Sequence, residues 1–390
     1  MLKIFICKLL FMLSLSIGLA TAKADENVLK VESLTIKPEG FTTPFEFKVT
    51  LPKKYSAGNS KPYFVLFDLH PRSQAYLGGL HDWLSHNGGW PWLETIVVTQ
   101  ANYHKDFASM FQSFMKEPDN SQILDVLAQI MNKIDSTYNT NGFRIYSGFV
   151  SNGALGLHAM LNRPEIFNAY IIASPSLSDD FGKVTSTATE KLKGLNDRLR
   201  FLYLTISEHD TKKNNIEGVK SFEESLKASA PSELEWTVKY DTEHYYMTLP
   251  VIAVLNGIEA LFDDYHKGLA PDSEVSSQGP DAIIEYYKTL SNKKYGFEVS
   301  AERSLRDLAK SMLESKPDEA IAIYKKVIGI YPDSAYALSS LAKAYEKLND
   351  LESAVTYQTQ AFDKANEKLS GWHQRKMKRT LDEMKNKLSD

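Results

Sequence analysis

The stretch from Arg144 to Ser176 decides the fold, and it reads RIYSGFVSNGALGLHAMLNRPEIFNAYIIASPS. Its pattern predicts a strand, a turn that contains glycine, a helix that ends at Pro164, and a second strand at Tyr170 to Ala173. A strand, a helix and a strand in this order form the repeating unit of parallel sheets. We therefore expect a βαβ unit here.

The alternation of strands and helices extends on both sides of this unit, from about Val28 to Phe262. Phe45 to Leu51 alternates apolar and polar residues, which predicts an edge strand. Short apolar runs predict buried strands at Tyr63 to Asp68 and Thr95 to Thr99, Phe201 to Ile206 is a further strand candidate, and apolar residues at helical spacing predict a helix at Ile123 to Ile134. The sequence therefore predicts an α/β domain with a mostly parallel sheet that helices cover on both faces.

The character of the sequence changes after Tyr265. Ser, Pro and Gly are frequent in residues 266–280, as they are in linkers. Beyond them the pattern is helical, and Ala320 and Ala354 lie 34 residues apart, which is the period of tetratricopeptide (TPR) repeats. We expect an α/β domain over 25–265, a linker over 266–280, and a small all-α TPR-like region over 281–390, with an ordinary helical bundle as the alternative for the last part.

The first 24 residues have the layout of a secretory signal peptide. Two lysines flank the start of a short apolar run, and Ala22 and Ala24 supply small residues for a cleavage site. The single cysteine, Cys7, lies inside this segment, so the mature chain has no disulfide. We expect export to a bacterial periplasm. The alternative is a transmembrane anchor, for which the run from Leu9 to Ala20 is short.

The stretch from Arg144 to Ser176 resembles the α/β-hydrolase esterases that are related to enterobactin and salmochelin esterases. Their sequences read R-x-x-x-G-x-S-x-G-G, then a helix, then R-P-E-x-F-x-A-Y-I-x-x-S-P-S. A match without gaps places Gly148 on the first glycine and Gly153 on the last, and residues 163–176 follow the second part. The resemblance implies an α/β-hydrolase fold over about 45–263, and some such esterases carry a similar TPR-like extension.

The same match places Val150 at the position of the nucleophilic serine, and valine has no nucleophilic atom. Ser151 offers a hydroxyl one residue later. If Ser151 were the nucleophile, Phe149 would lie in the tight turn where a small residue is needed. Ser151 as the nucleophile and Ser151 as a cap of the following helix both stay open.

The resemblance also implies the other catalytic groups. Tyr240 to Phe262 is similar to the histidine segment of these esterases and places His244 at the catalytic base. A base of this kind needs a carboxylate that orients its imidazole. The strand from Phe201 to Ile206 leads to the usual place of this acid, so the resemblance implies Glu208 as the first choice and Asp210 as the second.

Backbone N–H groups would stabilise the oxyanion of an ester hydrolase. The resemblance places one at Leu69, after the strand that ends at Asp68. The second belongs to the residue after the nucleophile, which is Asn152 if Ser151 is the nucleophile and Ser151 if the gapless match holds.

Two functions therefore stay open. The first is a carboxylic ester hydrolase that acts on a small molecule through a serine, His244 and an acid. The second is an inactive hydrolase-fold binding or scaffold protein whose TPR-like tail recruits a protein or peptide. The spacing of the histidines predicts no metal site, no glycine-rich loop predicts a cofactor, and a formal net charge of −4 does not indicate nucleic acid as a partner.

Overall fold

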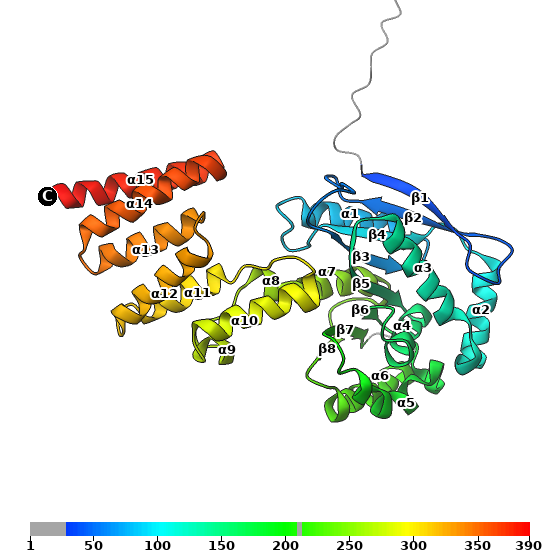
Figure 1. Ribbon diagram of the computed structural model, residues 1–390. Coiled ribbons are helices and arrows are strands. Elements are labelled where there is room, and N and C mark those ends of the chain that lie inside the picture. Colours follow the sequence, from blue (N-terminus) through cyan, green and yellow to red (C-terminus); the bar gives the residue numbers. More distant parts are fainter. Residues whose placement is uncertain (1–28, 209–212) are drawn as a thin grey trace, which may run out of the picture.

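A computed structural model describes residues 29–208 and 213–390, and the predicted signal peptide lies outside these residues. Within them, eight strands form one sheet in the order β1-β2-β4-β3-β5-β6-β7-β8 (Figure 1). The pairs β1–β2 and β2–β4 are antiparallel, and all other neighbours are parallel. The strands are β1 (Lys30–Ile36), β2 (Phe45–Leu51), β3 (Tyr63–Asp68), β4 (Thr95–Gln100), β5 (Thr140–Phe149), β6 (Ala169–Ala173), β7 (Arg200–Ser207) and β8 (Leu234–Asp241).

The central strands are the apolar runs that the sequence analysis singled out. Every residue of β3, β4, β6 and β7 is buried. On β3, Val65 and Phe67 belong to the core on one face of the sheet, while Phe64 and Leu66 belong to the core on the other. Because successive strand residues point to opposite faces, a run without polar interruptions is what a sheet covered on both sides requires.

Helices cover both faces of the sheet. One core includes residues of α1 (Ser73–Ser85) and α7 (Leu249–Leu261). The opposite core contains residues of five other helices, which are α2 (Lys105–Lys116), α3 (Ile123–Thr137), α4 (Ser151–Asn162), α5 (Val184–Lys191) and α6 (Lys213–Ser229). Short 3₁₀ turns lie at Pro118–Asn120, Ser178–Lys183, Leu192–Gly194 and Tyr246–Thr248.

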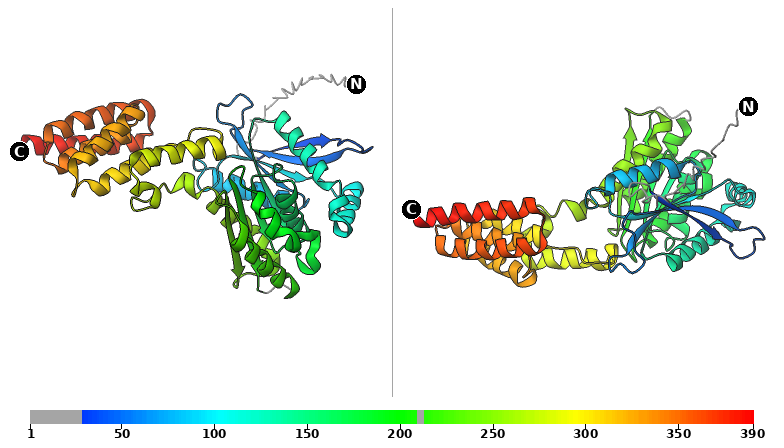
Figure 2. Two further views of the ribbon diagram at one scale, coloured as in Figure 1. Left: turned by 60° about the horizontal axis from the view of Figure 1, so that its bottom comes forward. Right: turned by 90° about the horizontal axis from the view of Figure 1, so that it is seen from above.

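The C-terminal part is helical, and Figures 1 and 2 show its last helices to one side of the sheet domain. Three alanines at the predicted repeat positions, Ala320, Ala354 and Ala361, are fully buried, which allows close approach between neighbouring helices. The helices are α8 (Asp263–His266), α9 (Glu274–Ser277), α10 (Pro280–Leu290), α11 (Glu302–Met312), α12 (Pro317–Ile330), α13 (Ala335–Lys347), α14 (Leu351–Lys368) and α15 (Gly371–Ser389), with a π-helical turn at Ser291–Tyr295.

The junction between the two parts is a packed structure. The buried Lys294 donates hydrogen bonds from Nζ to the carbonyl oxygen of Leu261 at 2.6 Å and to Asp264 at 2.7 Å. Asn141, in β5, donates from its side chain to the carbonyl oxygen of Tyr295 at 2.8 Å. These contacts attach the helical part to the amino-terminal edge of the sheet.

Within residues 29–208 and 213–390, every helix is too short or too polar to cross a lipid bilayer.

Candidate active site

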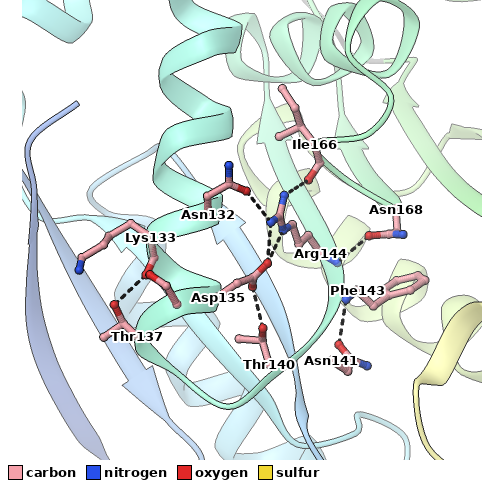
Figure 3. Close-up of polar contacts among 11 residues, drawn as sticks. Asn132, Lys133, Asp135, Thr137, Thr140, Asn141, Phe143, Arg144, Ile166 and Asn168 are labelled. Carbon is pink, nitrogen blue, oxygen red and sulfur yellow. Dashed lines mark hydrogen bonds and ion pairs between the residues drawn. The ribbon is translucent and has the colours of Figure 1, made fainter. Parts of the chain in front are cut away.

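Arg144 fixes the start of the strand that leads to the site. Its guanidinium group donates two hydrogen bonds to Asp135 of α3, at 2.9 Å from Nε and 2.5 Å from Nη2 (Figure 3). It also donates to the carbonyl oxygen of Ile166 at 3.2 Å, and the backbone N–H of Arg144 donates to the side chain of Asn168 at 3.0 Å. One side chain thus joins α3, β5 and the connection from α4 to β6, which sets the register of β5.

The chain bends sharply where β5 ends, and Val150 lies at the bend. Its φ of 55° and ψ of −117° are outside the regions that a β-branched residue ordinarily adopts. Two hydrogen bonds of its backbone hold this conformation: its N–H donates to Ala173 at 3.1 Å, and its carbonyl accepts from Ser176 at 3.1 Å. A strained turn between a strand and a helix is where an α/β hydrolase presents its nucleophile. Val150 lies at a turn of this kind, and the gapless match predicts that this is the nucleophile position.

Of the two glycines around the bend, Gly148 has no room for a side chain and Gly153 has little. A Cβ on Gly148 would lie 2.7 Å from the carbonyl oxygen of Asn152. A Cβ on Gly153 would lie 3.1 Å from a methyl group of Ile172 in β6. The glycines on either side of Val150 thus allow the first turn of α4 to pack directly against the sheet.

Ser151 lies one residue past the bend, as the first residue of α4, and it is half-buried. The N-cap of this helix is Val150, and no side chain makes a cap hydrogen bond there. The predicted capping role of Ser151 is therefore wrong, because the residue is already inside the helix.

His244 follows β8, and its ring contacts a carboxylate. Nδ1 of His244 lies 2.9 Å from Oδ2 and 3.1 Å from Oδ1 of Asp241, the last residue of β8. Asp241 also accepts hydrogen bonds from the backbone N–H groups of Glu243 at 3.0 Å and His244 at 2.7 Å. Burial raises the pKa of Asp241, but the hydrogen bonds from His244 and Glu243 outweigh it, so the net pKa is lowered and the carboxylate is charged at neutral pH.

The acid beside the imidazole therefore differs from the sequence prediction. Glu208 is exposed, and its backbone N–H donates to the carbonyl oxygen of Asp241 at 2.9 Å, while the carboxylate that contacts His244 is that of Asp241. Asp210 lies outside the described residues. The signal that could have identified Asp241 is its position three residues before His244, at the end of a strand.

Ring contacts bring the histidine segment to the bend. The ring of Phe149, directly before Val150, lies 4.9 Å from the ring of Tyr246, two residues after His244. The hydroxyl of Ser207 donates to the carbonyl oxygen of His244 at 3.0 Å and holds this segment against β7. Among the described residues, no hydrogen-bond partner of His244 Nε2 is present, so this nitrogen is available to a ligand.

The loop after β3 contains the expected oxyanion donor, Leu69. Buried Asp68 accepts hydrogen bonds from the N–H of His70 at 2.7 Å and from the hydroxyl of Ser147 at 2.8 Å. Burial raises the pKa of Asp68. No acceptor for the N–H of Leu69, Ser151 or Asn152 lies within the part of the chain that the structure describes. With Val150 at the bend, the residue after it is Ser151, so the second donor would be its N–H rather than that of Asn152.

A cavity of about 410 Å³ lies at the carboxyl edge of the sheet, and Val150, Ser151 and His244 are not among the residues that line it. Leu69 and Asn152 line it on one side, and α2 lines it on the other. Besides Leu69 and Asn152, the described residues of its wall combine aromatic and apolar side chains with two glutamines and two histidines, and none of them is Asp, Glu, Lys or Arg. These side chains are Tyr103, Phe107, Phe111, Met115, Gln100, Gln112, His70 and His104. Among the described residues, no group of three or more His, Cys, Asp or Glu lies close enough to hold a metal ion.

Comparisons with known proteins agree with the fold. Residues 311–365, from α11 to α14, match the family model of the tetratricopeptide repeat. The chain is similar in structure to an IroE-like serine hydrolase from Shewanella oneidensis, with 18% identity and a TM-score of 0.55 over 77% of this chain and 100% of that chain. It is also similar to an uncharacterised protein from Capnocytophaga ochracea DSM 7271, with 15% identity and a TM-score of 0.65 over 92% of this chain and 100% of that chain. No curated protein matches the chain. The predicted fold is confirmed: the chain has an α/β-hydrolase fold, followed by a helical region that matches the tetratricopeptide repeat.

Proposed function

We propose that this chain binds a small ester or a similar carbonyl compound in its hydrolase pocket and does not hydrolyse it through a serine. One observation carries the proposal, which is the conformation of Val150. Its φ of 55° places the side chain of a valine where the turn of an α/β hydrolase presents the nucleophile. Without a hydroxyl at this point no acyl-enzyme can form there.

The position of Ser151 supports the same conclusion. Val150 has non-helical backbone angles at the bend, whereas Ser151 is the first residue of the helix that follows. The side chain of Ser151, in the first turn of α4, therefore leaves the chain in a different direction from the side chain of Val150. A hydroxyl in this place is poorly oriented to replace one at the bend.

The pocket next to the bend suits an uncharged ligand with an apolar part. Its volume of about 410 Å³ is enough for a small organic molecule. The aromatic side chains of α2 would contact the apolar part, and the N–H groups of Leu69 and Asn152, for which no described residue is an acceptor, would donate hydrogen bonds to a carbonyl oxygen.

The remaining assignments extend this proposal. The TPR region would bind a protein or peptide partner, so that the chain joins a small-molecule pocket to a protein-binding surface. Export to the periplasm follows from the expected signal peptide. The protein-binding role of the TPR region and the export of the chain do not depend on which side chain lies at residue 150.

A second candidate function is an esterase that uses Ser151. The His244–Asp241 pair favours it, because a carboxylate at Nδ1 orients the imidazole as a general base. In this candidate, His244 removes the proton from the Ser151 hydroxyl, the oxygen attacks the ester carbonyl, and the alcohol leaves with the proton from His244.

Hydrolysis of p-nitrophenyl acetate separates the two candidates. In a binding protein, the wild type, Ser151→Ala and His244→Ala all release p-nitrophenol at the same background rate. In a Ser151 esterase, the wild type is active and both variants lose this activity. Rapid hydrolysis that depends on both residues would overturn the proposal.

Binding is tested with the amide analogue p-nitroacetanilide by isothermal titration calorimetry. Tyr103 lines the cavity and is 80% exposed, so Tyr103→Ala removes a contact with little risk to folding. We expect weaker binding in Tyr103→Ala and unchanged binding in Trp372→Ala, which removes an exposed aromatic side chain from α15. Equal binding in both variants would place the ligand elsewhere.

A further inference from the structure

A second cavity, of about 330 Å³, lies at the opposite edge of the sheet from the candidate active site. It is lined by Tyr63 and Phe64 at the start of β3, by residues that follow β2, by the end of α1, and by the segment that leads into β4. Phe297, which follows the π-helical turn, closes one side. The proposed ligand pocket involves none of these residues.

His81 of α1 lines this cavity, and its protonation can be deduced from one hydrogen bond. The backbone N–H of Thr95 donates to Nε2 of His81 at 2.9 Å. An N–H group can only donate, so Nε2 carries no proton. Burial lowers the pKa of His81 to about 4, so the ring is neutral at pH 7. A neutral imidazole has one proton, which must be on Nδ1.

The Nδ1–H of His81 is a buried donor without an acceptor. The residue is 1% exposed, and no hydrogen-bond partner of Nδ1 is present among residues 29–208 and 213–390. Buried polar groups in folded proteins nearly always have a partner, which can be a bound molecule. A cavity next to an unpaired donor is where such a partner would bind.

The charges around the cavity favour an acceptor that is negative. Three lysines and two carboxylates line it, and Lys53 already pairs with Asp82 at 3.1 Å. Lys61 lies over the ring of Phe297, 4.3 Å from its centre. Lys54 forms no ion pair with any described residue. After the Lys53–Asp82 pair is set aside, two lysines and one carboxylate, Glu94, remain in the lining. The lining therefore has a net positive charge.

We propose that this cavity binds a small oxyanion, a carboxylate or a phosphate, which accepts hydrogen bonds from His81 Nδ1–H and from the ammonium group of Lys54. His86 lines the same cavity, but its Nδ1 already bonds to the carbonyl oxygen of Trp83. His81 would therefore fix the orientation of the bound anion through its Nδ1–H, and Lys54 would supply a positive charge beside it. The proposal is independent of what the active-site pocket binds.

The experiment titrates the full mature chain with sodium phosphate and with sodium acetate, against sodium chloride at equal ionic strength. The readouts are the heat of binding and the ring signals of ¹⁵N-labelled histidine. We expect saturable binding of at least one anion, together with a shift of the signal of the protonated His81 Nδ1. The anion that binds identifies the ligand as a phosphate or a carboxylate.

Two lysine variants complete the test. Lys54→Gln should weaken binding about tenfold, because it removes a charged donor. Lys48→Gln changes an exposed lysine of β2 that does not line the cavity, so it should bind as the wild type does. Binding of neither anion, an unchanged His81 signal, or equal weakening by both variants would overturn the proposal and leave the cavity to water.

Discussion

The candidate active site has two parts, the segment around His244 and the bend at Val150, and they differ in the polar groups that they present. On the histidine side, His244 has a charged carboxylate at Nδ1, and no residue within 29–208 and 213–390 makes a hydrogen bond to its Nε2. At the bend, the strained backbone and the close glycines are present, but the side chain at the apex is a valine. The backbone of a strained turn is thus held by its own hydrogen bonds and by the glycines beside it, whichever side chain lies at the apex.

The largest expected effect comes from returning a hydroxyl to the bend. Val150→Ser should create hydrolysis of p-nitrophenyl acetate about a hundredfold above the wild-type rate, because the serine would face a prepared base. The double variant Val150→Ser/His244→Ala should return to the background rate. A Val150→Ser protein that folds and stays inactive would show that His244 does not reach the bend.

The anchor of β5 is the next test, because the bend depends on the register of this strand. Arg144→Met removes two hydrogen bonds to a largely buried Asp135 and should lower the free energy of unfolding by about 2 kcal/mol. Chemical denaturation measures it. Arg163→Met is the matched control: its ion pairs with Asp125 and Glu165 are more exposed, so the loss should be below about 1 kcal/mol. Equal losses would mean that Arg144 is not a special anchor.

Strain at the bend should be measurable directly. Val150→Gly relieves a positive φ and should raise the free energy of unfolding by about 1 kcal/mol. The same substitution at Val238, a half-buried residue of β8, should lower it, since a strand residue gains nothing from glycine. If both variants are destabilised alike, the bend stores no strain.

The smallest expected effect is the contribution of Asp241 to the pH dependence of the free energy of unfolding. Its pKa is lower in the folded protein than in the unfolded chain, so its contribution to stability is complete above about pH 4 and is lost as the pH falls through the folded pKa. Asp241→Asn should therefore flatten the dependence of unfolding free energy on pH below about pH 4. An unchanged dependence would mean that Asp241 does not bind the imidazole in solution.

The sequence predicted those helices, strands and turns whose pattern of apolar, glycine or alanine residues lies within one short segment of the chain. The apolar runs of β3, β4 and β7, the glycine turn before α4, and the alanine spacing of the TPR region all reflect packing along one segment. The gapless match places Val150 between two glycines, and the structure has Val150 at the bend between β5 and α4; its place at the nucleophile position stays a prediction.

The acid at His244 could not be predicted in the same way. The choice of Glu208 rested on the strand that usually carries this acid, whereas Asp241 becomes a candidate only when the end of β8 is known. Contacts of the predicted linker are also invisible in residue composition: Leu269 is partly buried against the core, and its N–H donates to the hydroxyl of Ser304 at 2.9 Å.

Labelling with a fluorophosphonate, followed by mapping of the modified peptide, tests most directly whether a reactive serine is absent from this site. The account predicts no labelled peptide from the wild type and a label on residue 150 in Val150→Ser. A label on Ser151 of the wild type, lost in His244→Ala, would contradict it.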